Sequence, residues 1–108
     1  MKPVRIDPEA RQEFLAAVDR YTARDGAVAV RFVAAVDRAL SRIHAEPHTL
    51  PLARDVPLAT GVRAVLVERF PYSVVFTELD SEIRILAFAH GRRRPGYWRD
   101  RADSSESG

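Results

Sequence analysis

Two apolar stripes at helical spacing, separated only by Asp25-Gly26, constrain the fold of this chain more than any other feature of its sequence. The first stripe spans residues 10–21 and follows Asp7-Pro8-Glu9, which offers an N-cap, a proline at the first helical position and an acid in the first turn. The second spans residues 28–43 and ends where Glu46-Pro47 breaks the helical pattern. Because the turn between them is so short, the two helices should form an antiparallel hairpin whose stripes face one core.

The rest of the chain has the pattern of β-strands. Runs rich in β-branched and aromatic residues occupy residues 62–68, 72–78 and 83–90, and a short apolar run at residues 4–6 could form an edge strand. Short turns such as Arg69-Phe70-Pro71 separate the last three runs, so these strands should be antiparallel neighbours. This order predicts an α+β fold (β-α-α-β-β-β), in which the N-terminal strand and the helical hairpin pack on a small, mainly antiparallel sheet.

The last predicted strand is apolar on both of its faces. Strict alternation divides it into two sets: Arg84, Leu86, Phe88 and His90 on one face, and Ile83, Ile85, Ala87 and Ala89 on the other. The helical hairpin covers only one face of the sheet. We therefore expect the other face to be uncovered, apolar and rimmed by arginine, which is typical of a landing surface for a partner segment.

Two segments have no regular pattern. Residues 47–61 contain three prolines and form a loop that is long for a small domain, which is typical of a functional loop or of one that covers a partner site. Residues 102–108 are polar and are expected to be a disordered tail. We predict one domain over residues 1–101, since a chain of 108 residues can bury a single modest core.

Several classes of protein are disfavoured by what the sequence lacks. There is no cysteine, which excludes disulfides and thiol chemistry. No run approaches the roughly 20 apolar residues of a membrane span, and the N-terminus lacks the apolar core of a signal peptide, so a cytoplasmic protein is expected. No metal or other cofactor is expected, because Pro47 separates His44 from His48 and the few glycines are not clustered.

Arginine dominates the basic residues, and Lys2 is the only lysine. On the two helices the charges are mixed in sign, and residues such as Arg20 and Arg38 are expected to be solvated helix surface. Residues 92–101, in contrast, hold five arginines and one acid, Asp100. Because the planar guanidinium suits phosphate and carboxylate groups, this segment is a candidate contact for a phosphate backbone or an acidic partner.

Three motifs along the chain resemble those of a known group of proteins. Arg63 lies early in the second predicted strand, Phe70-Pro71-Tyr72 opens the third, and residues 85–98 read ILAFAHGRRRPGYW. In this order and spacing they resemble the RelE/ParE superfamily of toxins from type II toxin–antitoxin systems, which includes the plasmid stabilisation proteins. The resemblance covers nearly the whole chain.

This resemblance implies a toxin that inhibits cell growth and that a cognate antitoxin neutralises by binding, in a toxin–antitoxin hetero-oligomer. Proteins similar to ParE poison DNA gyrase, whereas proteins similar to RelE are ribosome-dependent endoribonucleases that cleave mRNA. Fold alone does not separate the two targets. An inactive homologue kept only as an antitoxin-binding partner is a third alternative.

If the protein is a nuclease, four residues could form its catalytic site. Metal-free cleavage of RNA needs a base, an acid and cations on the phosphate. His90 could act as the acid or the base, Arg93 and Arg63 could clamp the phosphate, and Tyr97 could stack on a base or pass a proton. Tyr97 and Trp98 could instead be packing anchors of the C-terminal segment.

Two departures favour a gyrase-directed, non-enzymatic inhibitor over a nuclease. Toxins of this superfamily that cut RNA tend to carry several lysines or a carboxylate in the central strands, whereas the central strands here contain no lysine. In addition, Pro95-Gly96 before Tyr97 resembles the ParE side of the superfamily. The C-terminal segment then serves as a basic contact arm. Its predicted target-contact residues are Arg92, Arg93, Arg94, Trp98 and Arg99.

Overall fold

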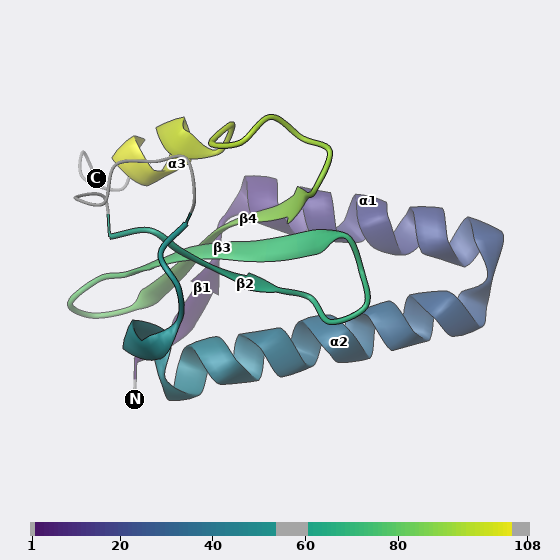
Figure 1. Cartoon of the computed structure of the whole chain (residues 1–108), viewed down its shortest axis with the longest axis horizontal. Coiled ribbons are helices and arrows are strands. Elements are labelled where there is room, and N and C mark those ends of the chain that lie inside the picture. The colour runs from purple at the N-terminus through teal and green to yellow at the C-terminus, as the bar shows by residue number, and fades with distance from the viewer. Residues whose placement is uncertain (1, 54–60, 105–108) are drawn as a thin grey trace.

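The helical hairpin, the sheet and a C-terminal helix form successive layers in the computed structural model, which describes residues 2–53 and 61–104 (Figure 1). In chain order the elements are β1 (Val4–Ile6), α1 (Pro8–Arg24), α2 (Gly26–Ala45), the 3-10 helix η1 (Pro47–Thr49), β2 (Arg63–Leu66), β3 (Tyr72–Glu78), β4 (Ile83–His90) and α3 (Arg99–Ser104). This order confirms the predicted α+β fold and adds α3 to it. None of the described helices is long and apolar enough to cross a membrane.

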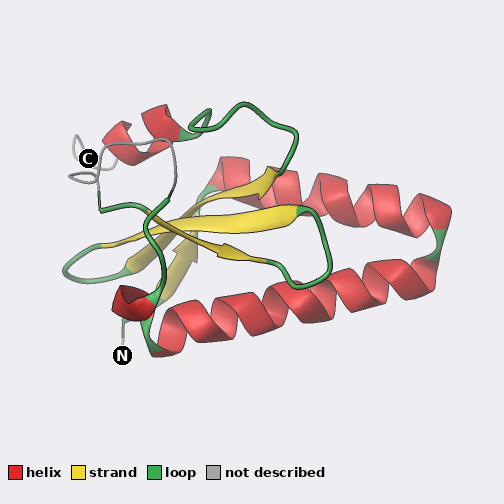
Figure 2. Cartoon of the chain, viewed as in Figure 1, coloured by secondary structure: helices red, strands yellow, loops and turns green. Residues whose placement is uncertain are grey.

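The helical hairpin has almost no linker, because Asp25 serves both helices (Figure 2). Its backbone amide donates to the Tyr21 carbonyl at the end of α1, at 2.8 Å. Its carboxylate accepts from the Ala27 amide in the first turn of α2, at 2.9 Å. One residue thus ends one helix and caps the next, which fixes the antiparallel hairpin.

Asp7 stands at the N-cap position of α1, but its side chain makes no capping hydrogen bond. Instead Arg84 of β4 donates to both carboxylate oxygens of Asp7, each at 2.7 Å. The expected capping role of the Asp7 side chain is therefore wrong. A bidentate ion pair to a guanidinium is stronger than a bond to a helix amide, and it ties the start of α1 to the sheet.

The sheet has the order β1-β4-β3-β2, so the two chain-terminal strands lie side by side. β3 pairs antiparallel with β2 and β4, as the short turns predicted, and β1 pairs parallel with β4 over residues 83–85. β1 is an edge strand, as expected, and it is much shorter than β4. Among the described strands, none therefore neighbours β4 on that side beyond Ile85.

A β-bulge in β4 corrects the alternation expected from the sequence. Val75 pairs with Ala87, but the next residue, Phe76, pairs with Ile85, so Leu86 is an extra residue. Past this bulge the faces exchange. Phe88 therefore lies in the same hydrophobic cluster as Ile85, under the helices, although strict alternation placed it on the opposite face.

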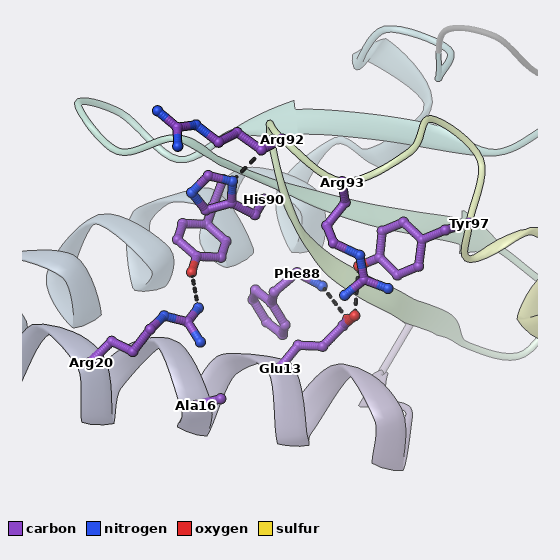
Figure 3. Close-up of a pocket in the computed structure, with 9 residues that line it drawn as sticks. Glu13, Ala16, Arg20, Phe88, His90, Arg92, Arg93 and Tyr97 are labelled. Atoms are coloured by element: carbon purple, nitrogen blue, oxygen red, sulfur yellow. Dashed lines mark hydrogen bonds between the residues drawn. The ribbon is translucent and has the colours of Figure 1, made fainter.

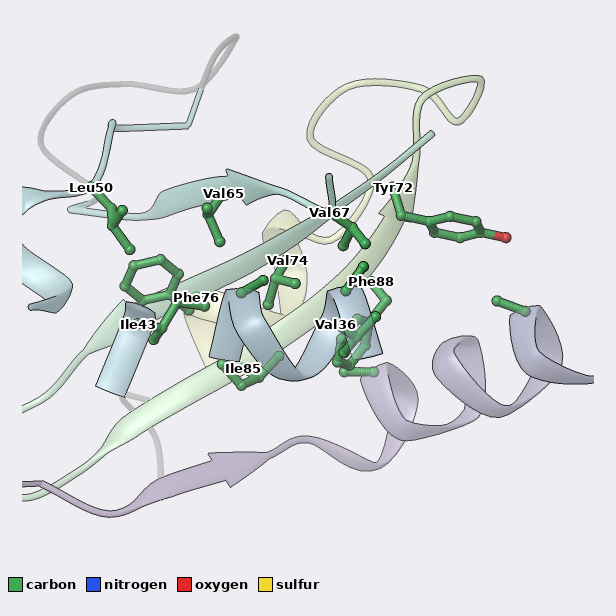
Figure 4. Packing of buried hydrophobic residues seen from close by; sticks show 14 of the residues in the cluster. Val36, Ile43, Leu50, Val65, Val67, Tyr72, Val74, Phe76, Ile85 and Phe88 are labelled. Atoms are coloured by element: carbon green, nitrogen blue, oxygen red, sulfur yellow. The ribbon is translucent and has the colours of Figure 1, made fainter. Parts of the chain in front are cut away.

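The main core fills the space between the hairpin and the sheet (Figure 4). Phe32 of α2 is fully buried at its centre. Four aromatic rings surround Phe32 at centroid distances of 5.0 to 6.0 Å: Tyr21, Phe70, Tyr72 and Phe14. Phe14 also contacts Phe88, at 5.4 Å, so this cluster seats α1 against the C-terminal end of β4.

The opposite face of the sheet is partly covered, which corrects a third expectation. Trp98, only 5% exposed, packs there on Val75, Leu86 and Ala87 in a separate hydrophobic cluster. Ala102 of α3 is packed against the same cluster. The C-terminal segment thus covers part of the face that the sequence suggested was free.

The two segments without a regular pattern are partly ordered. Within residues 47–61, η1 forms a turn and Leu52 makes an isolated antiparallel bridge with Arg63, while residues 54–60 lie outside the described residues. The tail predicted from residue 102 is helical as far as Ser104. Residues 105–108 lie outside the described part of the chain.

Candidate functional site

A pocket of about 450 Å³ lies at the end of β4, between α1 and the segment of residues 91–98, which we call the basic arm (Figure 3). The rings of Phe88 and Tyr72 form its apolar wall. The charged and polar side chains that line it are Glu13, Arg20, His90, Arg92, Arg93 and Tyr97. The pocket thus brings together residues from α1, from β4 and from the arm.

Backbone contacts hold the start of the basic arm, and the buried Trp98 holds its end. The Gly91 amide donates to the Pro71 carbonyl at 2.8 Å, and the Arg93 amide turns back to the His90 carbonyl at 3.0 Å. Gly96 has φ 77°, a left-handed conformation that other residues rarely adopt. This turn delivers Trp98 into the buried cluster on the sheet, so the arm is a loop tied down at both ends.

Glu13 of α1 is the centre of a hydrogen-bond network under the arm. Its carboxylate accepts from the Tyr97 hydroxyl at 2.6 Å, from the Arg101 guanidinium at 2.9 Å and from the Phe88 amide at 3.1 Å. Arg101 also donates to the Leu86 carbonyl, at 3.0 Å. These bonds occupy the edge of β4 that β1 leaves free.

The Tyr97 hydroxyl is held in its neutral form by this environment. Burial is the larger cause that raises its pKa above the ordinary tyrosine value, and the bond to the Glu13 carboxylate adds to it. A phenol with a raised pKa stays protonated and serves here as a donor to Glu13. It is poorly suited to accept a proton from a substrate.

The His90 ring is fixed on two sides. Its Nδ1 accepts from the Arg92 backbone amide at 3.0 Å, and its plane stands edge-on to the Tyr72 ring at a centroid distance of 5.0 Å. Since Nδ1 acts as an acceptor, the proton of the neutral imidazole is carried by Nε2.

The arginines of the site come from two places: the C-terminal segment, which supplies four exposed arginines, and α1, which supplies Arg20. Arg92, Arg93 and Arg94 are exposed on the arm, and Arg99 is exposed at the start of α3. The Arg93 guanidinium lies over the Tyr97 ring, 4.0 Å from its centroid. Arg20 reaches the pocket from α1 and donates to the Tyr72 hydroxyl.

The structure brings together three of the four residues proposed for catalysis. His90, Arg93 and Tyr97 line one pocket, whereas Arg63 lies on β2 and donates to the Leu50 carbonyl. Of the predicted target contacts, the four arginines are exposed and Trp98 is buried. In residues 2–53 and 61–104 no three histidine, aspartate or glutamate side chains are grouped so that they could hold a metal ion.

Sequence reasoning missed Glu13 and Arg20. Arg20 was taken as solvated helix surface, and it instead lines the pocket. The signal was present in the helical spacing, because positions 13 and 20 are seven residues apart and so lie on the same face of α1. The sequence does not show that this face of α1 packs beside the end of β4 and the basic arm, because that depends on the tertiary fold.

Comparisons with known proteins agree with this fold. A family model described as the ParE toxin of type II toxin–antitoxin system, parDE, matches residues 4–95. Among solved structures, the chain is similar to one from a chromosomal ParDE toxin–antitoxin system from P. aeruginosa, at 24% identity and a TM-score of 0.71, with 83% of this chain and 96% of that chain covered. It is also similar to the YoeB dimer from Staphylococcus aureus, at 13% identity and a TM-score of 0.54, with 82% and 95% covered.

At these identities the two structures support a shared fold and nothing more. No curated protein sequence gives a significant match. The family model, in contrast, spans most of the chain, including β1 to β4 and the first half of the basic arm. The predicted superfamily is thereby confirmed, and the chain belongs to the ParE toxin family of type II toxin–antitoxin systems.

Proposed function

We propose that this toxin inhibits growth by binding DNA gyrase through its basic arm, and that a cognate antitoxin neutralises it in the cytoplasm. The observation that carries the proposal is the presentation of Arg92, Arg93 and Arg94 in solvent on a loop tied down at both ends. Pre-organised cations of this kind speed association with a charged partner and set its orientation. Trp98 anchors the arm rather than touching the target.

The state of Tyr97 supports a binding role over catalysis. Its hydroxyl is engaged by Glu13 and stays protonated, so it is not free to receive a proton. Arg63, the second phosphate clamp of the nuclease hypothesis, lies outside the pocket. A nuclease would therefore have to work without Arg63 and without Tyr97 as a base, which leaves His90, Arg93 and a stacking role for Tyr97 from the expected set.

Supercoiling by purified gyrase tests the proposal. The wild-type toxin should inhibit supercoiling or trap cleaved DNA. A variant with Arg92→Gln, Arg93→Gln and Arg94→Gln should lose most of this effect. The matched control carries the same three changes on exposed helix positions, Arg11→Gln, Arg31→Gln and Arg38→Gln, and should remain inhibitory. A wild-type toxin that leaves gyrase unaffected at high excess contradicts the proposal.

One observation keeps ribosome-dependent RNA cleavage as a second candidate: His90, Arg93 and Tyr97 do share one pocket. Mapping of mRNA ends after induction separates the two functions. A nuclease produces new ends within codons, and His90→Ala abolishes them. A gyrase inhibitor leaves the ends unchanged, and His90→Ala keeps its toxicity.

The antitoxin proposal rests on family membership and on a second groove of about 660 Å³ between β2, β3 and the arm. Leu66 of β2 lies on this groove and is 67% exposed, which suits an apolar partner segment. Co-expression with the product of the adjacent reading frame should yield a co-purifying complex and relieve the growth defect. A chain that arrests no growth when expressed alone would be an inactive homologue.

A further inference from the structure

Glu13 is a charged residue on the buried face of α1. It comes three residues after Ala10 and four before Ala17, both fully buried, so the three side chains share one face of the helix. The Glu13 side chain is only 17% exposed. A carboxylate in such a place is unfavourable unless hydrogen bonds replace the water that it loses. The partners of Glu13 therefore indicate its role.

Most of these partners belong to the C-terminal segment. The Tyr97 hydroxyl donates to one carboxylate oxygen at 2.6 Å, and the Arg101 guanidinium donates to both oxygens, at 2.9 and 3.3 Å. The Phe88 amide of β4 donates at 3.1 Å. Two carboxylate oxygens offer about four acceptor sites, so these donors fill them. Buried ion pairs often add little net stability, and here the set of bonds selects one arrangement of the C-terminal segment on α1.

The Tyr97 ring that Glu13 holds also carries the Arg93 guanidinium, which lies 4.0 Å from the ring centroid. The attraction between a guanidinium and a ring face is modest at an exposed site, so it orients the arginine only when the ring itself is fixed. Figure 3 shows the Arg93 side chain beside Tyr97 and Glu13, with the Arg92 side chain directed away from them. This chain of contacts therefore reaches Arg93 and not Arg92.

Arg93 stands at the border between two concave surfaces. It lines the pocket beside α1 and also the groove between β2, β3 and the arm, and Tyr97 lines both as well. An exposed arginine has many rotamers, so at such a border it could face either surface. The bond from Tyr97 to Glu13 draws the ring towards α1, and Arg93 follows the ring (Figure 3).

We infer that Glu13 is a positioning residue of the basic arm: it fixes the Tyr97 ring, and the ring holds the Arg93 guanidinium on the α1 side. This role goes beyond the proposed function, in which backbone contacts and Trp98 hold the arm. Its effect on target binding rests on that function. Because burial and then Glu13 raise the pKa of Tyr97, the hydroxyl remains a donor at neutral pH and the arrangement persists.

The side-chain resonances of Arg93 in the full-length toxin test the inference without any target. In the wild type the ring current of Tyr97 should shift the Arg93 δ-methylene protons upfield from those of Arg94, an exposed arginine of the same arm. Glu13→Gln sets an amide donor against the donors that Glu13 accepts, and Tyr97→Phe keeps the ring but removes its hydroxyl. Each change should remove most of the difference in shift.

Two further variants trace the route of the effect. Asp19→Asn removes an exposed acid from the same helix and should leave the Arg93 shift unchanged. The double variant Glu13→Gln, Tyr97→Phe should lose no more of the shift than the stronger single variant, because both changes break the same chain of contacts. Urea unfolding measures the stability of each variant separately, and the dispersion of the amide spectrum reports whether it folds.

Inhibition of supercoiling shows what the position of Arg93 contributes to target binding. Glu13→Gln should weaken inhibition about fivefold, the loss of one cation–π contact of ordinary strength. Asp19→Asn should inhibit like the wild type. A wild type that leaves gyrase unaffected contradicts the proposed function, whereas the Arg93 shift still decides the positioning role, so the two failures can be told apart.

Three results would overturn the inference. An Arg93 shift that Glu13→Gln and Tyr97→Phe leave unchanged, even with a loss of stability, would make Glu13 a purely structural residue. Additive losses of shift in the double variant would mean that Glu13 does not act through Tyr97. Full inhibition by a Glu13→Gln variant that has lost the Arg93 shift would mean that this orientation does not serve the target.

Discussion

Asp7 and Arg84 are the charged residues buried in the described part of the chain, and they face each other across the α1–β4 boundary. Their bidentate pair also connects to the C-terminal helix, since Arg84 donates to the Arg101 carbonyl at 3.1 Å. The Arg84 side chain therefore joins the start of the first helix, the last strand and α3. Loss of one partner leaves the charge of the other buried without its ion pair.

Asp7→Ala should lower the free energy of unfolding by about 3–5 kcal/mol, because breaking a buried ion pair strands the remaining charge. Urea denaturation measures the loss. Lys2→Gln, which breaks an ion pair with Glu78 that is about one-third exposed, is the control and should cost at most about 1 kcal/mol. Equal losses for the two variants would contradict a buried, energetically important pair.

Tyr97 gives the fold a dependence on alkaline pH. Its pKa in the folded protein is raised above the ordinary value of 10.0, mainly by burial and then by Glu13. The unfolded chain therefore loses this proton at a lower pH than the folded chain does. The resulting stabilisation is complete below pH 10.0 and is lost as the pH rises through the folded pKa.

Comparison of the wild type with Tyr97→Phe isolates this effect. Between about pH 9 and about pH 11 the melting temperature of the wild type should fall more steeply than that of the variant. Tyr21, whose pKa is also raised by burial, is present in both proteins and cancels. Parallel curves would mean that the Tyr97 hydroxyl titrates normally.

Residues of the candidate site were predictable only where they are close in sequence. His90, Arg93 and Tyr97 lie within one strand end and its loop, so their proximity follows from local structure. Arg63 joined this set by residue type alone, and the fold places it on another strand. The contribution of α1 depends on how the hairpin is rotated against the sheet, which no local pattern specifies.

Periodicity predicted the helices and strands well, because amphipathic stripes and alternating strands are direct consequences of one-sided burial. The bulge at Leu86 was not predictable, since an extra apolar residue in an apolar strand leaves no signature. That single residue moves Phe88 under α1 and so builds the wall of the pocket. The hairpin turn, in contrast, was readable from Asp25-Gly26.

Asp25→Ala should destabilise the hairpin by about 1 kcal/mol, because the Ala27 amide loses its capping acceptor. Asp25→Asn keeps an acceptor oxygen at the same place and should lose much less. Thermal unfolding followed by circular dichroism gives both values. A large loss in the Asn variant would show that charge, rather than capping, matters at this position.

At the scale of the whole molecule, the C-terminal segment is part of the fold. Trp98 closes the second hydrophobic cluster, and the arm that leads to it lines both the pocket and the groove. The sequence suggested an uncovered sheet face. The segment after Trp98 is polar and its helix is only six residues long, so it was taken for a disordered tail. Stability and the presentation of the arm are therefore linked.

Trp98→Ala should cost about 3–5 kcal/mol, the range for removing a large buried aromatic side chain, and should also release the arm. Denaturant unfolding measures the first effect, and hydrogen exchange of the arm amides measures the second. Trp98→Phe fills part of the space and should retain more of both. Unchanged exchange in the Ala variant would mean that Gly91 and the turn after it hold the arm without Trp98.

Stretches of both edges of the sheet are covered by atoms of the same chain. Beyond β1, the Phe88 amide and the Leu86 carbonyl bond to Glu13 and Arg101. At the other edge, residues 51–53 bond to Val62 and Ala64. Exposed strand edges are where free copies of a protein associate into aggregates. A toxin molecule without its partner is therefore protected from self-association along these stretches, and what it offers to other molecules is its side chains.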